Sequence, residues 1–161
     1  MAFLYRRATV ADVPVMAHLP QKGEAGGDPE DRMIRYLEGE HHPQQALMPR
    51  AMWVAEMDGS AIGYTAGHLT RRFDCDGELQ WIYVVREHRR NHVASELLKL
   101  LAQWFVDRRA LRVCVNVGDE AARPFYFRHG ATDLRAHWMV WDDISLVLAD
   151  AGARAPVDPW A

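Results

Sequence analysis

A short basic segment between two apolar ones is the part of the sequence best suited to chemistry. The run 82–85 is apolar, Arg89 and Arg90 follow, and an amphipathic segment begins near His92. In a strand, loop and helix of this kind, backbone N–H groups of the helix N-terminus point at one spot, and the helix dipole adds positive potential there. The pattern predicts a site for an anion such as pyrophosphate, to which the arginines would add charge. The alternative is that the arginines form a solvated turn.

Other reactive side chains give weaker signals. His88 and His92 have the i, i+4 spacing that can hold a metal on a helix, but there is no HExxH motif and His88 falls before the predicted helix. We therefore expect no metal site. Cys75 and Cys114 have no adjacent base implied by the sequence, so we expect both thiols to be inert.

The spacing of apolar residues predicts the elements that would position the basic segment. Asp58-Gly59 between two apolar runs predicts a hairpin, and the apolar run Glu78–Val85 predicts a strand buried on both faces. The predicted order is β-α-α-β-β-β-α-β-α-β, a mixed sheet with helices on both faces, which is an α/β fold, or α+β by stricter bookkeeping. The predicted strands are 3–7, 52–57, 60–70, 78–85, 111–117 and 136–141, the predicted helices are 11–19, 29–38, 92–108 and 119–129, loops are expected at 20–29 and 41–49, and residues 142–161 have no assigned role.

Single residues mark some of the predicted helix ends. Thr9 and Asp28 are the expected N-caps of the first two helices, and Gly130 closes the last. Pro124 lies inside that last helix and is expected to make its first turn irregular, because proline has no N–H to donate.

The composition is that of an ordinary globular protein. The chain has 161 residues, of which 49% are hydrophobic and 25% charged, so we expect one domain over 1–161. A net charge of −3 argues against nucleic acid or an anionic membrane as partner, and the basic run 86–90 contains too few basic residues to change this. Two cysteines and no apolar stretch typical of a signal peptide or membrane span suggest a cytoplasmic protein.

Two motifs in the central part of the chain resemble those of the GNAT acetyltransferases. Arg89-Arg90-Asn91-His92-Val93-Ala94 is similar to that family's coenzyme A motif, Arg/Gln-x-x-Gly-x-Gly/Ala, with the central glycine replaced by His92. Residues 119–131 resemble the pattern Asn-x-x-Ala-x-x-Φ-Tyr-x-x-x-Gly-Phe, in which Φ is apolar. Ala122, Phe125, Tyr126 and Gly130 match, whereas Asp119 replaces the Asn and Ala131 the Phe. The resemblance covers about residues 3–141.

This resemblance implies a GNAT fold and acetyl-CoA as co-substrate, with no metal. Backbone groups of Ile82, Tyr83 and Val84 would pair with the pantetheine arm, and one N–H would polarise the thioester carbonyl. The pyrophosphate would be held by the loop and the helix start, and the rest of the cofactor site would come from the second motif. The complete expected set is Ile82, Tyr83, Val84, Arg89, Arg90, Asn91, His92, Val93, Ala94, Ser95, Asp119, Ala122 and Tyr126.

The resemblance also suggests an acid and a base. Tyr126 would protonate the departing thiolate, although a tyrosine buried in the core is the alternative reading. Glu78 would take the proton of the acceptor ammonium, although it could equally be an exposed charge at a strand edge. Asp74 and Asp76 in the preceding turn are weaker choices for the base.

The sequence thus favours an enzyme that moves an acetyl group to a primary amine of a small molecule or protein by direct attack on the thioester. The stretch 24–40 carries six acidic residues, a bias that fits a cationic acceptor but is explained as well by a solvated helix face. The rival function is a non-catalytic GNAT-fold module that binds coenzyme A, suggested by His92 in place of glycine. Neither the acceptor nor the oligomeric state is fixed by the sequence, and a homodimer is compatible with it.

Overall fold

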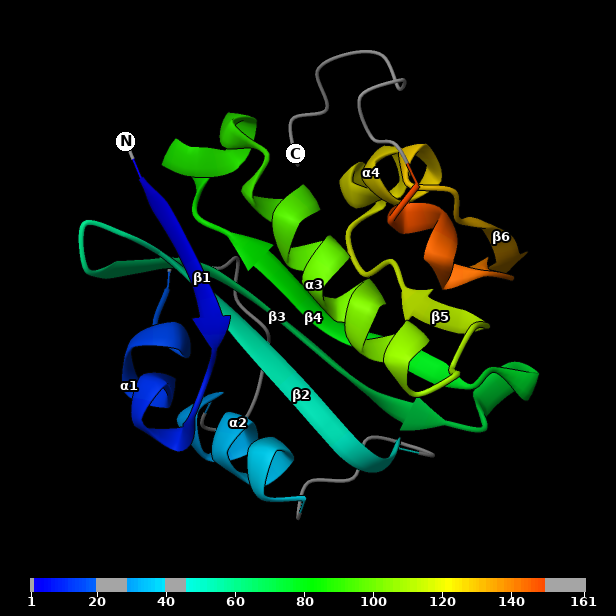
Figure 1. Cartoon of the computed structure of the whole chain (residues 1–161), viewed down its shortest axis with the longest axis horizontal. Helices are drawn as coiled ribbons and strands as arrows, with labels where there is room; N and C mark the ends of the chain where they lie inside the picture. The colour runs from blue at the N-terminus through cyan, green and yellow to red at the C-terminus, as the bar shows by residue number, and fades with distance from the viewer. Residues whose placement is uncertain (1, 20–28, 40–45, 150–161) are drawn as a thin grey trace.

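The strand predicted to be central is the fourth of seven in one sheet of order β1-β2-β3-β4-β5-β7-β6. The computed structural model describes residues 2–19, 29–39 and 46–149 (Figure 1). Neighbouring strands are antiparallel except β4 and β5, which are parallel. The mixed sheet confirms the predicted α/β fold. The strands are β1 (Phe3–Arg7), β2 (Ala46–Met57), β3 (Ser60–Thr70), β4 (Gly77–Val84), β5 (Val113–Asn116), β6 (Thr132–Arg135) and β7 (Trp138–Trp141).

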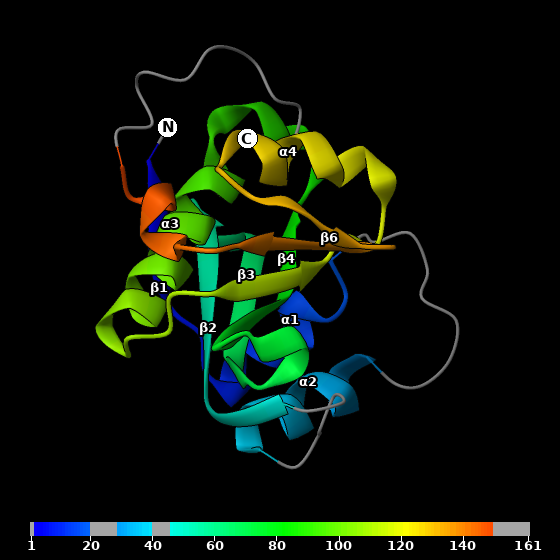
Figure 2. The same cartoon turned by 90° about the vertical axis from the view of Figure 1, so that its right-hand side faces the viewer.

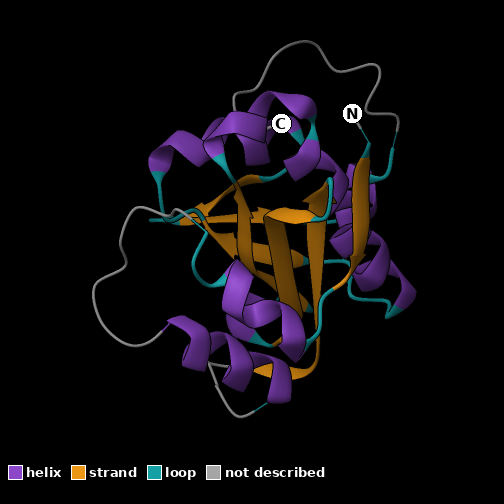
Figure 3. Cartoon of the chain, turned by 90° about the vertical axis from the view of Figure 1, so that its left-hand side faces the viewer, coloured by secondary structure: helices purple, strands orange, loops and turns teal. Residues whose placement is uncertain are grey.

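Helices cover both faces of the sheet, as predicted. The long helix α3 crosses β2, β3 and β4 on one face, while α1 contacts β3 and α2 contacts β2 on the other (Figures 2 and 3). The helices are α1 (Val13–Met16), α2 (Pro29–Glu38), α3 (Val93–Asp107) and α4 (Arg123–Arg128), and the 3₁₀ turns are η1 (Val10–Asp12), η2 (Arg72–Asp74), η3 (Arg86–Asn91), η4 (Glu120–Ala122) and η5 (Ile144–Val147). No helix in these described ranges is long and apolar enough to span a membrane.

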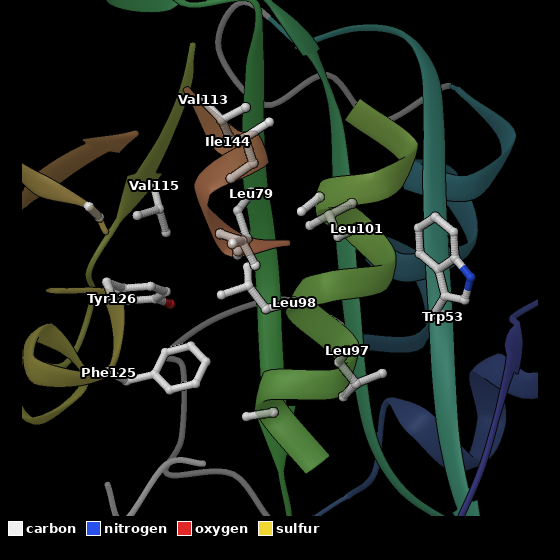
Figure 4. Packing of buried hydrophobic residues seen from close by; sticks show 14 of the residues in the cluster. Trp53, Leu79, Leu97, Leu98, Leu101, Val113, Val115, Phe125, Tyr126 and Ile144 are labelled. Carbon is white, nitrogen blue, oxygen red and sulfur yellow. The ribbon is translucent and has the colours of Figure 1, made fainter. Parts of the chain in front are cut away.

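The two largest apolar clusters of the described residues join the sheet to the helices on its two faces. The larger lies between α3 and the sheet and includes Leu97 and Leu101 (Figure 4), and the smaller lies beneath α1 and α2 and includes Tyr36 and Val54. The close approach of α3 depends on Gly67, where a Cβ would lie 2.8 Å from Leu101 Cδ1. A larger residue there would push the helix from the sheet.

Local signals in the sequence predicted several of these elements correctly. Asp58 and Gly59 turn the β2–β3 hairpin with φ of 51° and 81°, as a type I′ turn requires. The second predicted helix, 29–38, matches α2. The predicted N-cap Thr9 precedes η1, and Asp12 accepts a hydrogen bond from its N–H at 2.8 Å. The irregular start expected at Pro124 is present, because the 3₁₀ turn η4 precedes α4. The predicted cap Asp28 lies outside the described residues.

Other predicted elements were wrong in extent. The helix expected over 11–19 is a 3₁₀ turn followed by four residues of α1, and the helix expected over 119–129 is divided between η4 and α4. β2 begins at Ala46 within a predicted loop, since a bulge near Pro49 and Arg50 hides its alternating pattern. β6 was missed because it is an edge strand with mostly exposed residues. The strands expected over 111–117 and 136–141 are shorter, and residues 144–147 form η5 against α3.

Candidate active site

β4 and β5 separate partway along β4. They pair only where residues 77–79 face 113–115, whereas β4 continues to Val84. The separation follows Gln80, an extra residue of β4 that has no pairing partner in β3. A bulge of this kind bends its strand and increases the local twist. Among the described residues, no strand pairs with the β5-facing edge of β4 beyond this point. The bulge therefore leaves backbone N–H and C=O groups of β4 facing a gap.

Two adjoining cavities occupy this gap. The smaller has a volume of about 160 Å³ and a mainly apolar lining, and the larger has a volume of about 500 Å³. Ile82, Tyr83, Val117 and Tyr126 line both cavities, so the two meet at these side chains. The remaining lining of the larger cavity includes the charged side chains Arg72 and Glu78 and the aromatic rings of Tyr64, Trp81 and Trp138.

Seven of the predicted site residues come together in the smaller cavity. They come from β4, the first turn of α3 and the segment before and within α4, which are far apart in the sequence. They are Ile82, Tyr83, Val84, Ala94, Asp119, Ala122 and Tyr126. Glu78 lies in the larger cavity, while the other predicted residues line neither; these are Arg89, Arg90, Asn91, His92, Val93 and Ser95.

Tyr126 stands where the cavities meet. Its side chain is 4% exposed, and its ring packs edge-on against Phe125 and Trp141. In Figure 4 its hydroxyl points away from α4, and in the described part of the chain it has no hydrogen-bond partner. Burial raises the pKa of Tyr126 well above the ordinary value for a phenol, because the phenolate would lose its hydration. The side chain is therefore a neutral hydroxyl facing an apolar space.

Glu78 is buried rather than exposed at a strand edge, so that alternative is wrong. Its residue is 4% exposed, and Oε1 accepts a hydrogen bond from Nε of Arg72 at 2.8 Å. A buried carboxylate of this kind needs such a partner, since desolvation of an unpaired charge costs several kcal/mol. His68 lies directly opposite Glu78 in the β3–β4 register, and its Nε2 is 3.8 Å from Oε1 of Glu78. Two strands and a turn thus place one carboxylate at the wall of the larger cavity.

The basic loop forms η3 and leads into α3 through His92. His92 has φ of 59° and ψ of 20°, the left-handed conformation that glycine adopts without steric cost. Its side chain is exposed, and its carbonyl accepts the first hydrogen bond of the helix from Glu96 N–H. The N–H groups of residues 93–95 precede that bond and are the free donors of the helix N-terminus. The glycine that the motif has at this position is therefore explained by backbone geometry, since glycine adopts this conformation without strain.

The polar side chains around this loop have different surroundings. Arg89 donates from Nε to the carbonyl of Val84 at 2.9 Å, which ties the loop to the end of β4, while Arg90 is exposed. Oγ of Ser95 lies 3.1 Å from Nε2 of His129, linking α3 to the end of α4. Asp119 accepts a hydrogen bond from the N–H of Ala121 at 3.0 Å and so caps η4.

The sequence did not reveal most of the larger cavity. Trp81 and Trp138 are the tryptophans that line it, alongside Arg72, Gln80 and Asn116. The alternation of residues in β4 would have indicated that Trp81 shares a face with neighbouring aromatics, but no local signal marks Arg72. The hydrogen bond between Arg72 and Glu78 forms because the turn η2 folds back onto β4.

Other sequence features lie away from the cavities. Glu30 of α2 pairs with His18, and Asp31 pairs with Arg35 at i, i+4, so described acids of the 24–40 stretch belong to a solvated helix face. Within the described ranges, no group of three His, Cys, Asp or Glu side chains is placed to hold a metal ion. Cys75 and Cys114 are buried thiols.

Solved structures share this fold at low sequence identity. The PaiA N-acetyltransferase from Thermoplasma acidophilum, solved in complex with coenzyme A, aligns with a TM-score of 0.61 and 13% identity over 87% of this chain and 97% of its own. The ribosomal-protein-S18-alanine N-acetyltransferase from Escherichia coli aligns with a TM-score of 0.64 and 14% identity over 87% of this chain and 93% of its own. A nourseothricin acetyltransferase gives 0.60 and 19%, over 88% and 98%. At these identities the likeness concerns the fold.

The sequence itself carries the family assignment. No curated protein matches the chain. The model of the acetyltransferase (GNAT) family, in contrast, matches residues 18–131, which include the strand, the loop, the helix and Tyr126 described above. The chain therefore belongs to the GNAT family of acetyltransferases and is an enzyme of that type.

Proposed function

We propose that this enzyme transfers the acetyl group of acetyl-CoA to a primary amine by direct attack of the amine on the thioester. The observation that carries the proposal is that the two cavities meet at Tyr126, one bounded by the free edge of β4 and the other by the buried Glu78. One cavity offers a seat for a thioester and the other a seat for an amine, with an acid at their junction and a base on the amine side.

The smaller cavity fits the pantetheine arm of the co-substrate. Its apolar lining suits an alkyl chain, and the N–H groups of Ile82 and Val84 and the carbonyl of Ile82 point away from β3 at the unpaired edge of β4, where the amides of the arm can pair with them. One of these N–H groups would stabilise the negative charge that develops on the thioester oxygen. The free N–H groups before Glu96 and the exposed Arg90 would hold the pyrophosphate.

Starting from the ammonium form, the acceptor nitrogen must lose two protons, one before and one after its attack, and the departing sulfur must gain one, so the reaction releases one proton overall. An alkyl ammonium has a pKa near 10.4, so at pH 7 a base must deprotonate the amine before it can attack. Glu78 takes this role, because it is the carboxylate that lines the larger cavity. Tyr126 then protonates the departing thiolate. Its raised pKa does not prevent this, because burial in the same apolar cavity also makes the thiolate a stronger base.

The larger cavity favours an acceptor with a single ammonium group beside a flat apolar body. Its charged pair, Arg72 and Glu78, has no net charge, and aromatic rings of Trp81 and Trp138 form part of its lining. A polycation would meet the guanidinium of Arg72, which opposes further positive charge. Because one structural neighbour acts on a ribosomal-protein alanine and another on nourseothricin, the fold by itself is compatible with a protein or a small molecule as acceptor.

A panel of amines tests this proposal. Acetyl-CoA is mixed with tyramine, spermidine, glucosamine or a short peptide with a free N-terminus, and thiol release is followed with and without enzyme. We expect release above background with at least one monoamine and less with spermidine. Binding of coenzyme A without amine-dependent thiol release from any of these would support the non-catalytic module instead.

A further inference from the structure

We propose that His68, held by Tyr36, is a positioning residue for the base Glu78. This inference rests on the proposed function, because it concerns the same proton transfer. Its starting point is a polar pair that the proposed mechanism does not use, in the smaller of the two apolar clusters. His68 and Tyr36 are both 0% exposed, and His68 Nδ1 lies 2.8 Å from the hydroxyl of Tyr36.

The register of β3 and β4 places His68 beside Glu78. His68 and Glu78 are directly opposed residues of β3 and β4, so their side chains leave the same face of the sheet. Behind them, the ring of Tyr36 packs against Trp81, a wall of the larger cavity, at 4.8 Å between centroids. The pair is therefore a second layer behind the acceptor side of the site.

The proton between Tyr36 and His68 can be assigned from the groups around it. Burial raises the pKa of Tyr36 well above its ordinary value, so the phenol keeps its proton. If His68 Nδ1 carried the imidazole hydrogen, its bare Nε2 lone pair would face the Glu78 carboxylate oxygen at 3.8 Å, which is repulsive. If Tyr36 donates to Nδ1, the hydrogen lies on Nε2 and points at Glu78. The second arrangement is the favourable one.

Two donors then compete for Glu78 Oε1. Arg72 Nε holds it at 2.8 Å, while His68 Nε2 is buried at 3.8 Å with no hydrogen-bond partner in the described part of the chain. An orphaned buried N–H is costly, so a small rotation of the carboxylate toward His68 is compensated by a new hydrogen bond. A carboxylate held by a neutral donor is a stronger base than one held by a guanidinium. His68 thus stabilises the Glu78 position in which proton uptake is favoured.

The charged and titratable groups facing His68 come from four elements. Glu78 is on β4 and Arg72 on η2, as described above. Tyr36 is on α2, and Arg50 of β2 stacks over the Tyr36 ring at 4.8 Å and donates to the Tyr36 carbonyl at 2.9 Å. Four elements thus bring charged or phenolic groups to His68 and its partner Tyr36.

Two substitutions at one position test the inference. A glutamine at 68 can place its amide N–H near the former Nε2, whereas an asparagine reaches only as far as Nδ1. With tyramine, or whichever amine of the panel turns over fastest, we expect His68→Asn to lower kcat by ~10–100-fold with little change in the KM for acetyl-CoA. His68→Gln should retain kcat within about threefold of the parent.

A double-mutant cycle shows whether His68 acts through Glu78. In a Glu78→Gln background, His68→Asn should change the remaining rate by less than about twofold, because the group it positions is gone. Val54→Ala is the control for lost stability, since Val54 is a fully buried residue of the same apolar cluster and its side chain has no polar atom. This control should lower the melting temperature with kcat unchanged.

The outcomes separate this inference from the proposed function. Full kcat in His68→Asn, equal losses in the Asn and Gln variants, or a loss that persists undiminished in the Glu78→Gln background would each overturn it, while acetyl transfer by the parent would stand. If the parent acetylates no amine, or Glu78→Gln keeps full kcat, the proposed acid–base assignment itself fails and this inference fails with it.

Discussion

The proposed base and the proposed acid of the cleft are equally buried but have opposite surroundings. Glu78 and Tyr126 are each 4% exposed. Glu78 carries a charge that Arg72 meets at 2.8 Å, whereas Tyr126 touches mainly aromatic rings. A buried charge must be paired, but a neutral phenol needs only space. The comparison indicates that the ion pair of the base stabilises the fold, whereas the hydroxyl of the acid does not. A change at Glu78 should therefore lower both activity and stability, and a change at Tyr126 should lower activity alone.

The largest effect is expected at Glu78. Glu78→Gln should lower kcat by ~10²–10³-fold and the free energy of unfolding by about 3 kcal/mol, because it breaks a buried ion pair with Arg72. Steady-state kinetics and urea unfolding measure the two losses. The double variant Glu78→Gln/Arg72→Gln should regain most of the stability and none of the turnover. An inactive Glu78→Gln variant with an unchanged free energy of unfolding would contradict the claim that the ion pair stabilises the fold.

Tyr126→Phe should give the complementary result. We expect kcat to fall by ~10–100-fold while the KM for acetyl-CoA is unchanged, because the hydroxyl acts on the leaving thiolate in the transition state. The melting temperature should move by less than about 2 °C, since no hydrogen bond among the described residues is lost. Tyr5→Phe is the matched control at a half-buried tyrosine that lines neither cavity, and it should leave kcat unchanged. A Tyr126→Phe variant with full kcat would make Tyr126 a core residue only.

The raised pKa of Tyr126 has a consequence at alkaline pH. Above about pH 10 the unfolded chain loses the phenolic proton while the folded protein keeps it, so stability falls with rising pH by up to about 1.4 kcal/mol per pH unit from this group. Unfolding free energies of the parent and of Tyr126→Phe, compared at pH 9 and at higher pH, should therefore diverge, with the steeper decline in the parent. Parallel curves would mean that burial does not perturb this side chain.

The smallest effect is expected at His92, whose side chain is exposed and forms no ion pair among the described residues. The exposed His92 holds a left-handed backbone at φ of 59°. His92→Gly should raise the unfolding free energy by about 0.5–1 kcal/mol, since glycine relieves that strain at some cost in chain entropy. Titration calorimetry at pH 6 and at pH 8 should give affinities for coenzyme A that differ by less than about threefold between the parent and His92→Gly. A tenfold loss of affinity in the glycine variant would make His92 a phosphate ligand.

Local signals in the sequence predicted the parts of the fold and site that depend on neighbouring residues. The Asp58-Gly59 turn and the bounds of α2 follow from residue types within a few positions. Seven of the nine residues that line the smaller cavity belong to the expected set, four from the two short motifs and three from the strand before them, whereas Val117 and Phe125 were not expected there.

The rest depends on contacts between distant segments. The hydrogen bond from Tyr36 to His68 joins residues that are 32 positions apart, and Arg72 reaches Glu78 only because η2 folds back onto β4. The extent of β2 was hidden by Pro49 and Arg50, which interrupt its pattern. The bulge at Gln80 opens the cleft, yet glutamine is no signal for a bulge. Such features follow from register and packing, which a single sequence does not specify.

The dependence of the initial rate on the concentrations of both substrates tests the central claim most directly. If amine attacks acetyl-CoA while both are bound across the junction at Tyr126, initial rates measured at several concentrations of each should give intersecting double-reciprocal lines. The protein incubated with acetyl-CoA alone should show no added acetyl group by mass spectrometry. Parallel lines together with a covalently acetylated protein would mean that a side chain carries the acetyl group first, and would contradict direct transfer between the two cavities.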